Sequence, residues 1–270
     1  MDALSKLKFQ NDKRKHICVG LDTDKTKIPS FLNSSPNPIL DFNKTIIENT
    51  HDAVAAYKVN FAFYEKLGAE GFKIISKTIE QIPDDILIIA DAKRGDIGNT
   101  SKMYAASMFD YFKCDASTLN PFMGEDSISP FLEYKDKLNF ILTLTSNQGA
   151  NDFQKLKLED GSFLFQHVIS KVKSWNKNNN CGLVFGATKA DELEKNMVNF
   201  GSLPVLLPGI GAQGGDLKSV VKLFYQNNKT NFLINVSRSV IYKSRNKDFG
   251  EAAANEVTAM NNRISGLSIY

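Results

Sequence analysis

The chain has 270 residues, 42% of them hydrophobic, and a formal net charge of +3. This length accommodates one large α/β barrel or two small domains, with enough apolar residues for a sizeable core. The net charge is nearly neutral and the lysines are spread along the chain without a concentrated basic stripe, which argues against nucleic-acid binding. No apolar run reaches the roughly 18 residues of a membrane span.

The first residues, about 1–14, are expected to form a short N-terminal helical segment. They are too polar for a secretory signal and carry acidic residues, which transit peptides avoid. The cysteines Cys18, Cys114 and Cys181 lie far apart in apolar runs, as is usual for buried thiols of a reducing compartment. We therefore expect a soluble, cytoplasmic protein.

Eight strand-like runs follow, each short and rich in branched or apolar residues. Stretches compatible with helices lie between them, among them 61–80, 98–112, 162–177 and 215–227. Strands that alternate with helices favour parallel pairing, and eight repeats predict an α/β fold closed into a (β/α)8 TIM barrel. The strand-like runs are 16–22, 55–61, 86–91, 114–120, 140–145, 181–186, 204–209 and 232–238.

A doubly wound open sheet is the structural alternative. It would usually have fewer units and a glycine-rich turn after its first strand, where this chain has Asp22. Because no linker interrupts the pattern, we expect a single barrel domain over 1–270. The polar segment 146–161 is a long connection and a candidate lid.

The third run leads into the most informative motif, Asp91-Ala-Lys93-Arg-Gly-Asp96. In an extended segment Asp91 and Lys93 point to the same side, so a carboxylate and an ammonium leave the core together. Charges gathered at the edge of an apolar interior are frequently functional. For this motif alone, a surface ion pair at a strand end is the alternative.

Other polar residues also fall at the ends of predicted strands. In a parallel barrel these ends meet at one mouth, where active sites form. Taken singly, Asp22 could cap a helix, Lys58 could be a solvated lysine and Arg238 a surface cation. Their convergence favours a site. Its candidates are Asp22, Lys58, Asn60, Asp91, Lys93, Asp96, Thr145, Ser146, Ser237 and Arg238.

The last two strand ends predict a phosphate site. The glycine-rich segment 209–215 follows the seventh run, and glycines let a backbone approach a ligand closely. Arg238, at the next strand end, can bind phosphate in bidentate fashion. Phosphate sites after strands seven and eight recur in this fold.

Neither a metal nor a cofactor is expected. The three cysteines are scattered, and His16, His51 and His167 are isolated, so that no zinc cluster or histidine triad is apparent. The chemistry is therefore assigned to lysine and aspartate.

Six segments, in this order, resemble the orotidine 5′-monophosphate decarboxylase family: CVGLD, AAYKVNFAFY, ADAKRGDIGNT, LTSN, PGIGAQGGD and NVSRSVIY. The resemblance spans roughly 16–245 and fits the family's longer subgroup, found in bacteria and some protozoa. One departure is Gln148, where proline is expected after Thr-Ser-Asn; it concerns the stiffness of the loop. The resemblance implies cofactor-free decarboxylation of orotidine 5′-monophosphate to UMP, the last step of UMP synthesis, by a homodimer.

The resemblance also implies residue roles. Lys58, Asp91, Lys93 and Asp96 form an alternating lysine–aspartate array, to which Asp96, with Ile97 and Thr100, comes from the partner subunit. Asp22, Lys58, Asn60 and Thr100 hold ribose hydroxyls or orient the array, Ser146 and Thr145 meet the pyrimidine, Gln213, Ser237 and Arg238 bind the 5′-phosphate, and Pro208 is a further substrate contact.

Within this array Lys93 is expected to do the chemistry. Loss of CO2 from C6 of the pyrimidine leaves an electron pair that the ring cannot delocalise. An ammonium fixed beside C6 opposes that charge and then supplies the proton.

Three other interpretations remain open. A Mg²⁺-dependent 3-keto sugar-phosphate decarboxylase of the same barrel superfamily shares the motif but should have an extra acidic ligand at the mouth. A Schiff-base aldolase would use Lys58 or Lys93 as a nucleophile, although a lysine between carboxylates stays charged and is a poor one. A non-catalytic nucleotide-binding barrel would not need the complete array.

Overall fold

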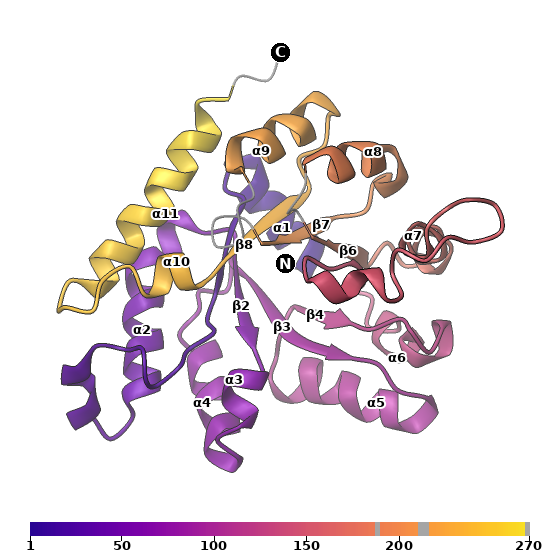
Figure 1. Ribbon diagram of the computed structural model, residues 1–270. Helices are drawn as coiled ribbons and strands as arrows, with labels where there is room; N and C mark the ends of the chain where they lie inside the picture. Colours follow the sequence, from indigo (N-terminus) through magenta and orange to yellow (C-terminus); the bar gives the residue numbers. More distant parts are fainter. Residues whose placement is uncertain (187–189, 210–215, 268–270) are drawn as a thin grey trace.

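The computed structural model describes residues 1–186, 190–209 and 216–267. Within this part of the chain, parallel strands pair in sequence order, and β8 returns to β1, so that the sheet closes into a barrel. Helices surround the barrel (Figure 1), and the predicted (β/α)8 fold is confirmed. The strands are β1 Ile17–Gly20, β2 Ala56–Asn60, β3 Leu87–Arg94, β4 Ala116–Leu119, β5 Leu138–Leu144, β6 Cys181–Phe185, β7 Val205–Pro208 and β8 Phe232–Val236.

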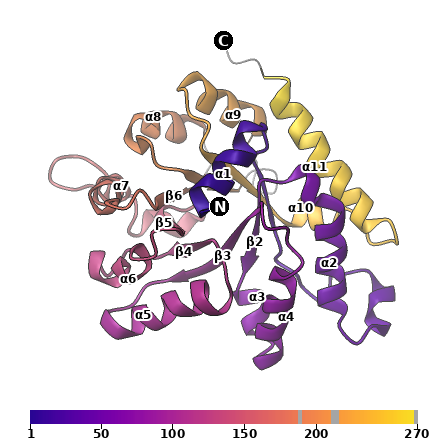
Figure 2. The ribbon, with the colours of Figure 1, turned by 180° about the vertical axis from the view of Figure 1, so that it is seen from behind.

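The helices form the outer layer and pack their apolar faces on the strands (Figures 1 and 2). The expected helix 61–80 divides in two at Gly68, whose φ of +63° ends the regular backbone. The expected helix 98–112 changes after residue 106 to a π-helical turn. The helices are α1 Ala3–Asp12, α2 Pro38–Thr50, α3 Ala62–Glu65, α4 Ala69–Ile79, α5 Gly98–Ala106, α6 Ser129–Leu132, α7 Leu164–Trp175, α8 Ala190–Phe200, α9 Leu217–Gln226, α10 Arg238–Ile241 and α11 Phe249–Ser265. Among the helices described, none combines the length and the apolar character needed to span a bilayer.

Helix α1 closes the end of the barrel where the strands begin. Ala3 and Leu7 belong to the same buried cluster as the side chains that fill the barrel interior. Lys6 of this helix places its ammonium 2.9 Å from both carboxylate oxygens of Asp115, which also accepts the backbone N–H of Ile88. Figure 2 shows α1 lying across this end. The opposite end, where the strands finish, is left for a site.

Strand β3 is longer than its apolar run predicts. It continues to Arg94, and its pairing with β4 shifts register between Ala90 and Arg94. In this irregular stretch, called the bulge below, three residues of β3 lie between the pairs that flank Thr118 of β4, so that Asp91 and Lys93 lie within the strand and not after it. The predicted run 86–91 ends three residues too early, because pairing with β4 resumes at Arg94 beyond the bulge.

His16, just before β1, is a buried titratable group at the closed half of the barrel. Its Nδ1 lies 3.2 Å from the carbonyl oxygen of Phe232 and its Nε2 lies 3.0 Å from the Tyr225 hydroxyl. The imidazole also stacks on the Phe232 ring at 4.0 Å. Burial lowers the pKa of His16 from 6.5 to about 4, despite an opposing hydrogen bond to Phe232. The folded protein therefore holds a neutral imidazole where the unfolded chain binds a proton.

We predict that acid destabilises the protein through His16. Its contribution to stability is complete above pH 6.5 and is lost as the pH falls toward 4, because only the unfolded chain takes up the proton in that window. The loss amounts to about 3 kcal/mol at 1.36 kcal/mol per pKa unit. Urea unfolding of the wild type and of His16→Asn between pH 7.5 and 4 measures it, and the variant should show a shallower decline. Parallel declines would contradict this account.

Candidate active site

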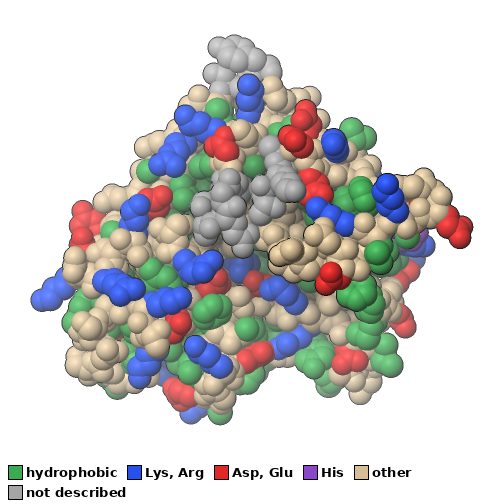
Figure 3. All heavy atoms as spheres, viewed as in Figure 1, with side chains coloured by type: hydrophobic (Ala, Val, Ile, Leu, Met, Phe, Trp, Pro, Cys, Tyr) green, Lys and Arg blue, Asp and Glu red, His purple; other side chains and the backbone are tan. Residues whose placement is uncertain are grey.

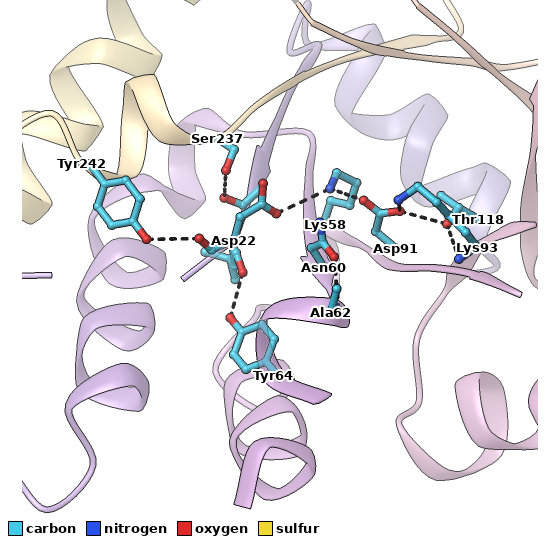
Figure 4. A network of polar contacts seen from close by, with 12 residues as sticks. Asp22, Lys58, Asn60, Ala62, Tyr64, Asp91, Lys93, Thr118, Ser237 and Tyr242 are labelled. Atoms are coloured by element: carbon cyan, nitrogen blue, oxygen red, sulfur yellow. Dashed lines mark hydrogen bonds and ion pairs between the residues drawn. The ribbon is translucent and has the colours of Figure 1, made fainter. Parts of the chain in front are cut away.

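The predicted strand-end residues meet at the open end of the barrel. Asp22 follows β1, Lys58 lies on β2 and Asp91 and Lys93 lie on β3, and their side chains form a row (Figure 4). In the space-filling view of this end, acidic and basic side chains lie side by side near the middle (Figure 3). The structure thus brings together four of the residues that the sequence singles out.

Lys58 is the buried cation of this row. Its Nζ lies 2.6 Å from Oδ2 of Asp91 and 3.7 Å from Oδ1 of Asp22. Burial by itself would lower the pKa of Lys58, but the two carboxylates outweigh it and hold the pKa above its usual value. Lys58 therefore stays charged at any physiological pH, with a hydrogen bond to Asp91 and a longer ion pair to Asp22.

Asp91 is the anion at the centre. The residue is 8% exposed. Its carboxylate accepts hydrogen bonds from Lys58 Nζ and Lys93 Nζ, each at 2.6 Å, and from the Thr118 hydroxyl at 3.0 Å. Burial would raise the pKa of Asp91, yet the two ammonium groups and their hydrogen bonds hold it well below its usual range. The Asp91 carboxylate is thus held ionised between the two lysine side chains.

Lys93 differs from Lys58 in backbone and in exposure. Its φ is +49°, in the left-handed region, which costs a non-glycine residue on the order of 1–3 kcal/mol. The prediction that Asp91 and Lys93 share a side through regular strand alternation is therefore wrong in its reason: the bulge breaks the alternation, and the Lys93 side chain turns back to Asp91. Since 51% of this side chain remains exposed, its ammonium is both anchored and accessible.

Asp96, Ile97 and Thr100 do not join this row in their own chain. The carboxylate of Asp96 accepts the backbone N–H of Ile97 at 2.8 Å, and the Ile97 side chain is 61% exposed. Thr100, on the first turns of α5, is exposed as well. Within the described residues, the ion pairs of Lys58 and Lys93 are formed with Asp22 and Asp91 and not with Asp96. Ile97 and Thr100 are thus exposed and Asp96 is half-buried, without an ion pair to the lysines of the row in the described part of the chain.

Two tyrosines that sequence reasoning missed hold the loop of Asp22. Tyr64 donates to the Leu21 carbonyl at 2.8 Å, and Tyr242 donates to the Asp22 carbonyl at 3.1 Å while accepting the Asp24 N–H at 2.7 Å. No helix begins at Asp22, so the helix-cap alternative is wrong. Tyr242 belongs to the NVSRSVIY segment, but its spacing from Asp22 along the chain gives no sign of contact.

Thr118 is a further residue that the sequence analysis passed over. It lies on β4, and its hydroxyl bonds both Asp91 and the backbone N–H of Lys93. A polar residue within a short buried strand was the one available signal. Asn60, by contrast, was expected here: its side-chain oxygen accepts the N–H of Ala62 at the start of α3, and the residue is half-buried at the mouth.

The end of β5 is tied to its loop. Thr145 donates its backbone N–H to the side-chain oxygen of Gln154 at 2.7 Å and its hydroxyl to the side-chain oxygen of Asn147 at 2.6 Å. Ser146 is half-buried next to Gly186, where a Cβ would come within 2.8 Å of the Ser146 nitrogen. Of the two predicted pyrimidine contacts, Thr145 is thus occupied in holding the loop that follows.

The predicted phosphate residues lie at the ends of β7 and β8. Pro208 ends β7 and is half-buried, whereas Gln213 lies outside the described residues. Ser237 follows β8 and donates its hydroxyl to the Gly20 carbonyl at 3.0 Å, which joins the ends of β8 and β1. Arg238 is exposed as the first residue of α10.

Comparison with known proteins places this geometry in a family. The model of the Orotidine 5'-phosphate decarboxylase / HUMPS family matches residues 15–253. The orotidine 5'-phosphate decarboxylase of Dehalococcoides mccartyi is 45% identical over 269 residues, which are 98% of each chain.

Solved structures agree with this assignment. The structure of Leishmania donovani OMP decarboxylase has a TM-score of 0.82 and 36% identity, covering 97% of this chain and 99% of that one. Leishmania donovani UMP synthase has a TM-score of 0.87 and 37% identity over 98% of this chain, but this chain spans only 57% of the synthase. The chain therefore belongs to the orotidine 5'-phosphate decarboxylase family.

Proposed function

We propose that this protein converts orotidine 5′-monophosphate to UMP by decarboxylation, the last step of UMP synthesis. The observation that carries the proposal is the Lys93 ammonium, held 2.6 Å from the buried Asp91 carboxylate and exposed at the open end of the barrel. Family membership and the 45% identity to a decarboxylase of this name support the same reaction.

The proposed chemistry needs a cation beside the reacting carbon. When CO2 leaves C6, the electron pair stays in the plane of the ring and cannot be delocalised. The Lys93 ammonium opposes this charge and then transfers its proton to C6. At about 4 Å and an effective dielectric near 20, such an attraction is worth roughly 4 kcal/mol.

Preorganisation explains why the lysines and acids alternate. Asp91 and Asp22 keep Lys58 charged, and Lys58 in turn helps to keep Asp91 ionised, as the opposite directions of their pKa shifts indicate. The Lys93 ammonium is thus aligned before the reaction begins, and little reorganisation is required when charge develops at C6.

Substrate binding is assigned by position around this row. Asp22 and Asn60 hold ribose hydroxyls, Ser146 with Thr145 meets the pyrimidine, and the exposed Arg238 binds the 5′-phosphate. Ser237, Pro208 and Gln213 complete the phosphate end. The support is geometric for the described residues, which lie at the ends of β1, β2, β5, β7 and β8, at one mouth of the barrel.

We propose that the protein works as a homodimer in which Asp96, Ile97 and Thr100 enter the partner's site. Asp96 lies outside the row of its own chain, and apolar side chains are exposed on the segments that follow β3 and β4, among them Ile97, Met103 and Phe122. Apolar surface of this kind favours association. We assign the protein to the cytoplasm, which agrees with its three buried, free cysteines.

Two acids at the mouth bear on the Mg²⁺-dependent alternative. Asp22 and Asp91 both face the Lys58 ammonium, which takes the place where a cation bound by these carboxylates would lie. Loss of the ultraviolet absorbance of orotidine 5′-monophosphate in the presence of EDTA tests the proposed reaction. Decarboxylation that stops in EDTA and returns with Mg²⁺ would favour the alternative.

Lys93→Ala should reduce turnover at least about 10³-fold, because it removes the roughly 4 kcal/mol of attraction to the forming carbanion. The fold should remain, since Asp91 keeps Lys58 and Thr118 as partners. Initial rates and circular dichroism measure the two effects. Lys135→Ala, which removes an exposed lysine at the closed end, is the matched control and should retain wild-type turnover. Appreciable decarboxylation by Lys93→Ala would remove Lys93 from its role.

Mixing Lys93→Ala with Asp96→Ala protein should regenerate activity if the sites are shared. In a mixed dimer one site receives Lys93 from one subunit and Asp96 from the other. Random exchange in a symmetric dimer then restores about a quarter of wild-type activity. Rates before and after mixing measure it, with native mass spectrometry to verify exchange. No recovery despite exchange would count against the contribution from the partner.

Arg238→Ala should raise KM and lower kcat/KM about 100-fold, because charged hydrogen bonds to the phosphate are lost. Binding energy from this remote group is used to favour the transition state, so the effect should not be confined to KM. Arg245→Ala, an exposed arginine just beyond α10, is the control. An unchanged kcat/KM in Arg238→Ala would place the phosphate elsewhere.

A further inference from the structure

Thr118 contacts both Asp91 and Lys93 of the Asp91–Asp96 motif. It is 2% exposed, on β4, next to the bulged part of β3. Its Oγ1 accepts the backbone N–H of Lys93 at 3.0 Å and donates to Oδ1 of Asp91 at 3.0 Å (Figure 4). One hydroxyl therefore contacts both the backbone of the exposed lysine and the carboxylate that anchors its ammonium.

The bulge explains why a side chain is needed at this point. The β3–β4 pairing is regular at Ala90 and resumes at Arg94, so the intervening residues are out of register with β4. In the left-handed conformation of Lys93, its N–H donates to the Thr118 hydroxyl of β4. Without that hydroxyl the N–H would lose its partner in a partly buried place.

We propose that Thr118 is a positioning residue for the decarboxylation: it holds Lys93 in its left-handed conformation and keeps the Lys93 ammonium against Asp91. This role rests on the proposed function of Lys93.

Threonine suits this role chemically. A hydroxyl has one proton and two lone pairs, so it can donate to Asp91 while it accepts from Lys93. Its β-branched side chain has few rotamers, which limits the directions that the hydroxyl can take. Valine has nearly the same shape but neither a donor nor an acceptor, and serine keeps both with less stiffness.

Thr118→Val should therefore lower kcat about 10- to 100-fold, the effect of losing a hydrogen bond to a charged group. KM for orotidine 5′-monophosphate should change little, because Thr118 acts through Lys93 on the transition state and not on the bound substrate. Thr118→Ser should recover most of the loss in kcat.

Thr143→Val is the matched control. Thr143 lies on the adjacent strand β5, is 3% exposed, and donates its hydroxyl to the Val184 carbonyl at 2.6 Å without contacting the lysine–aspartate row. This variant also removes one buried hydroxyl from the barrel. It should lower the unfolding midpoint to a similar degree as Thr118→Val, with kcat unchanged.

The experiment combines kcat, KM and unfolding midpoints of these variants with crystal structures of Thr118→Val and Thr118→Ser. We expect the kcat loss in Thr118→Val alone, together with a changed φ at Lys93 or a longer Nζ–Asp91 distance. Wild-type kcat in Thr118→Val, or an unaltered Lys93, would overturn the proposal. If the wild type itself does not decarboxylate orotidine 5′-monophosphate, the proposed function fails, and the Lys93 geometry in the two structures still decides whether Thr118 positions it.

Discussion

The buried carboxylate of Asp91 is the group on which the arrangement of the site depends. An ionised carboxylate taken out of water is strongly unfavourable unless charged and hydrogen-bonding partners replace the water. Here the replacement is complete, with two ammonium groups within 2.6 Å and a hydroxyl at 3.0 Å. Each partner is held in place because leaving would expose an uncompensated charge. The same energetic constraint therefore positions Lys58, Lys93 and Thr118 together.

A second buried aspartate at the other end of the barrel shows what distinguishes the site. Asp115 has one ammonium, that of Lys6, and a backbone N–H, so its charge is matched and enclosed under α1. Asp91 is shared between two lysines, and the second of them remains half-exposed. The first arrangement fastens a helix to the barrel. The second leaves a cation available to a ligand while its position is still imposed by the protein.

The surroundings of Asp22 extend the same principle to a loop. Tyr64 lies on α3 and Tyr242 directly follows α10, and their hydroxyls bond the backbone of Leu21 and of Asp22 (Figure 4). Ser237 joins the end of β8 to that of β1. The segment bearing Arg238 and the loop bearing Asp22 are thus fixed relative to each other by neutral hydrogen bonds, which leaves the charged groups to the row and to the mouth.

The amino-acid sequence by itself determined the repeating strand–helix order, the (β/α)8 fold and the strand ends that carry Asp22, Lys58, Asp91 and Lys93. These follow from local patterns: short branched runs, their spacing, and charged residues where a buried run stops. The row of four charges could be predicted from the sequence because the ends of parallel strands in a closed barrel lie at one mouth.

The tertiary structure alone decided the bulge in β3, the left-handed Lys93, the contacts of Thr118 and Tyr242, and, among the described residues, the absence of Asp96 from the ion pairs of the row. Each depends on the register between neighbouring strands or on a contact between distant segments, such as Tyr242 with Asp22. The alternation of residues along one strand has a period of two, and it cannot predict a bulge that depends on the pairing with a neighbouring strand. Local sequence patterns thus identify the charged residues, whereas the direction of each side chain is set by the neighbours that the closed barrel places beside it.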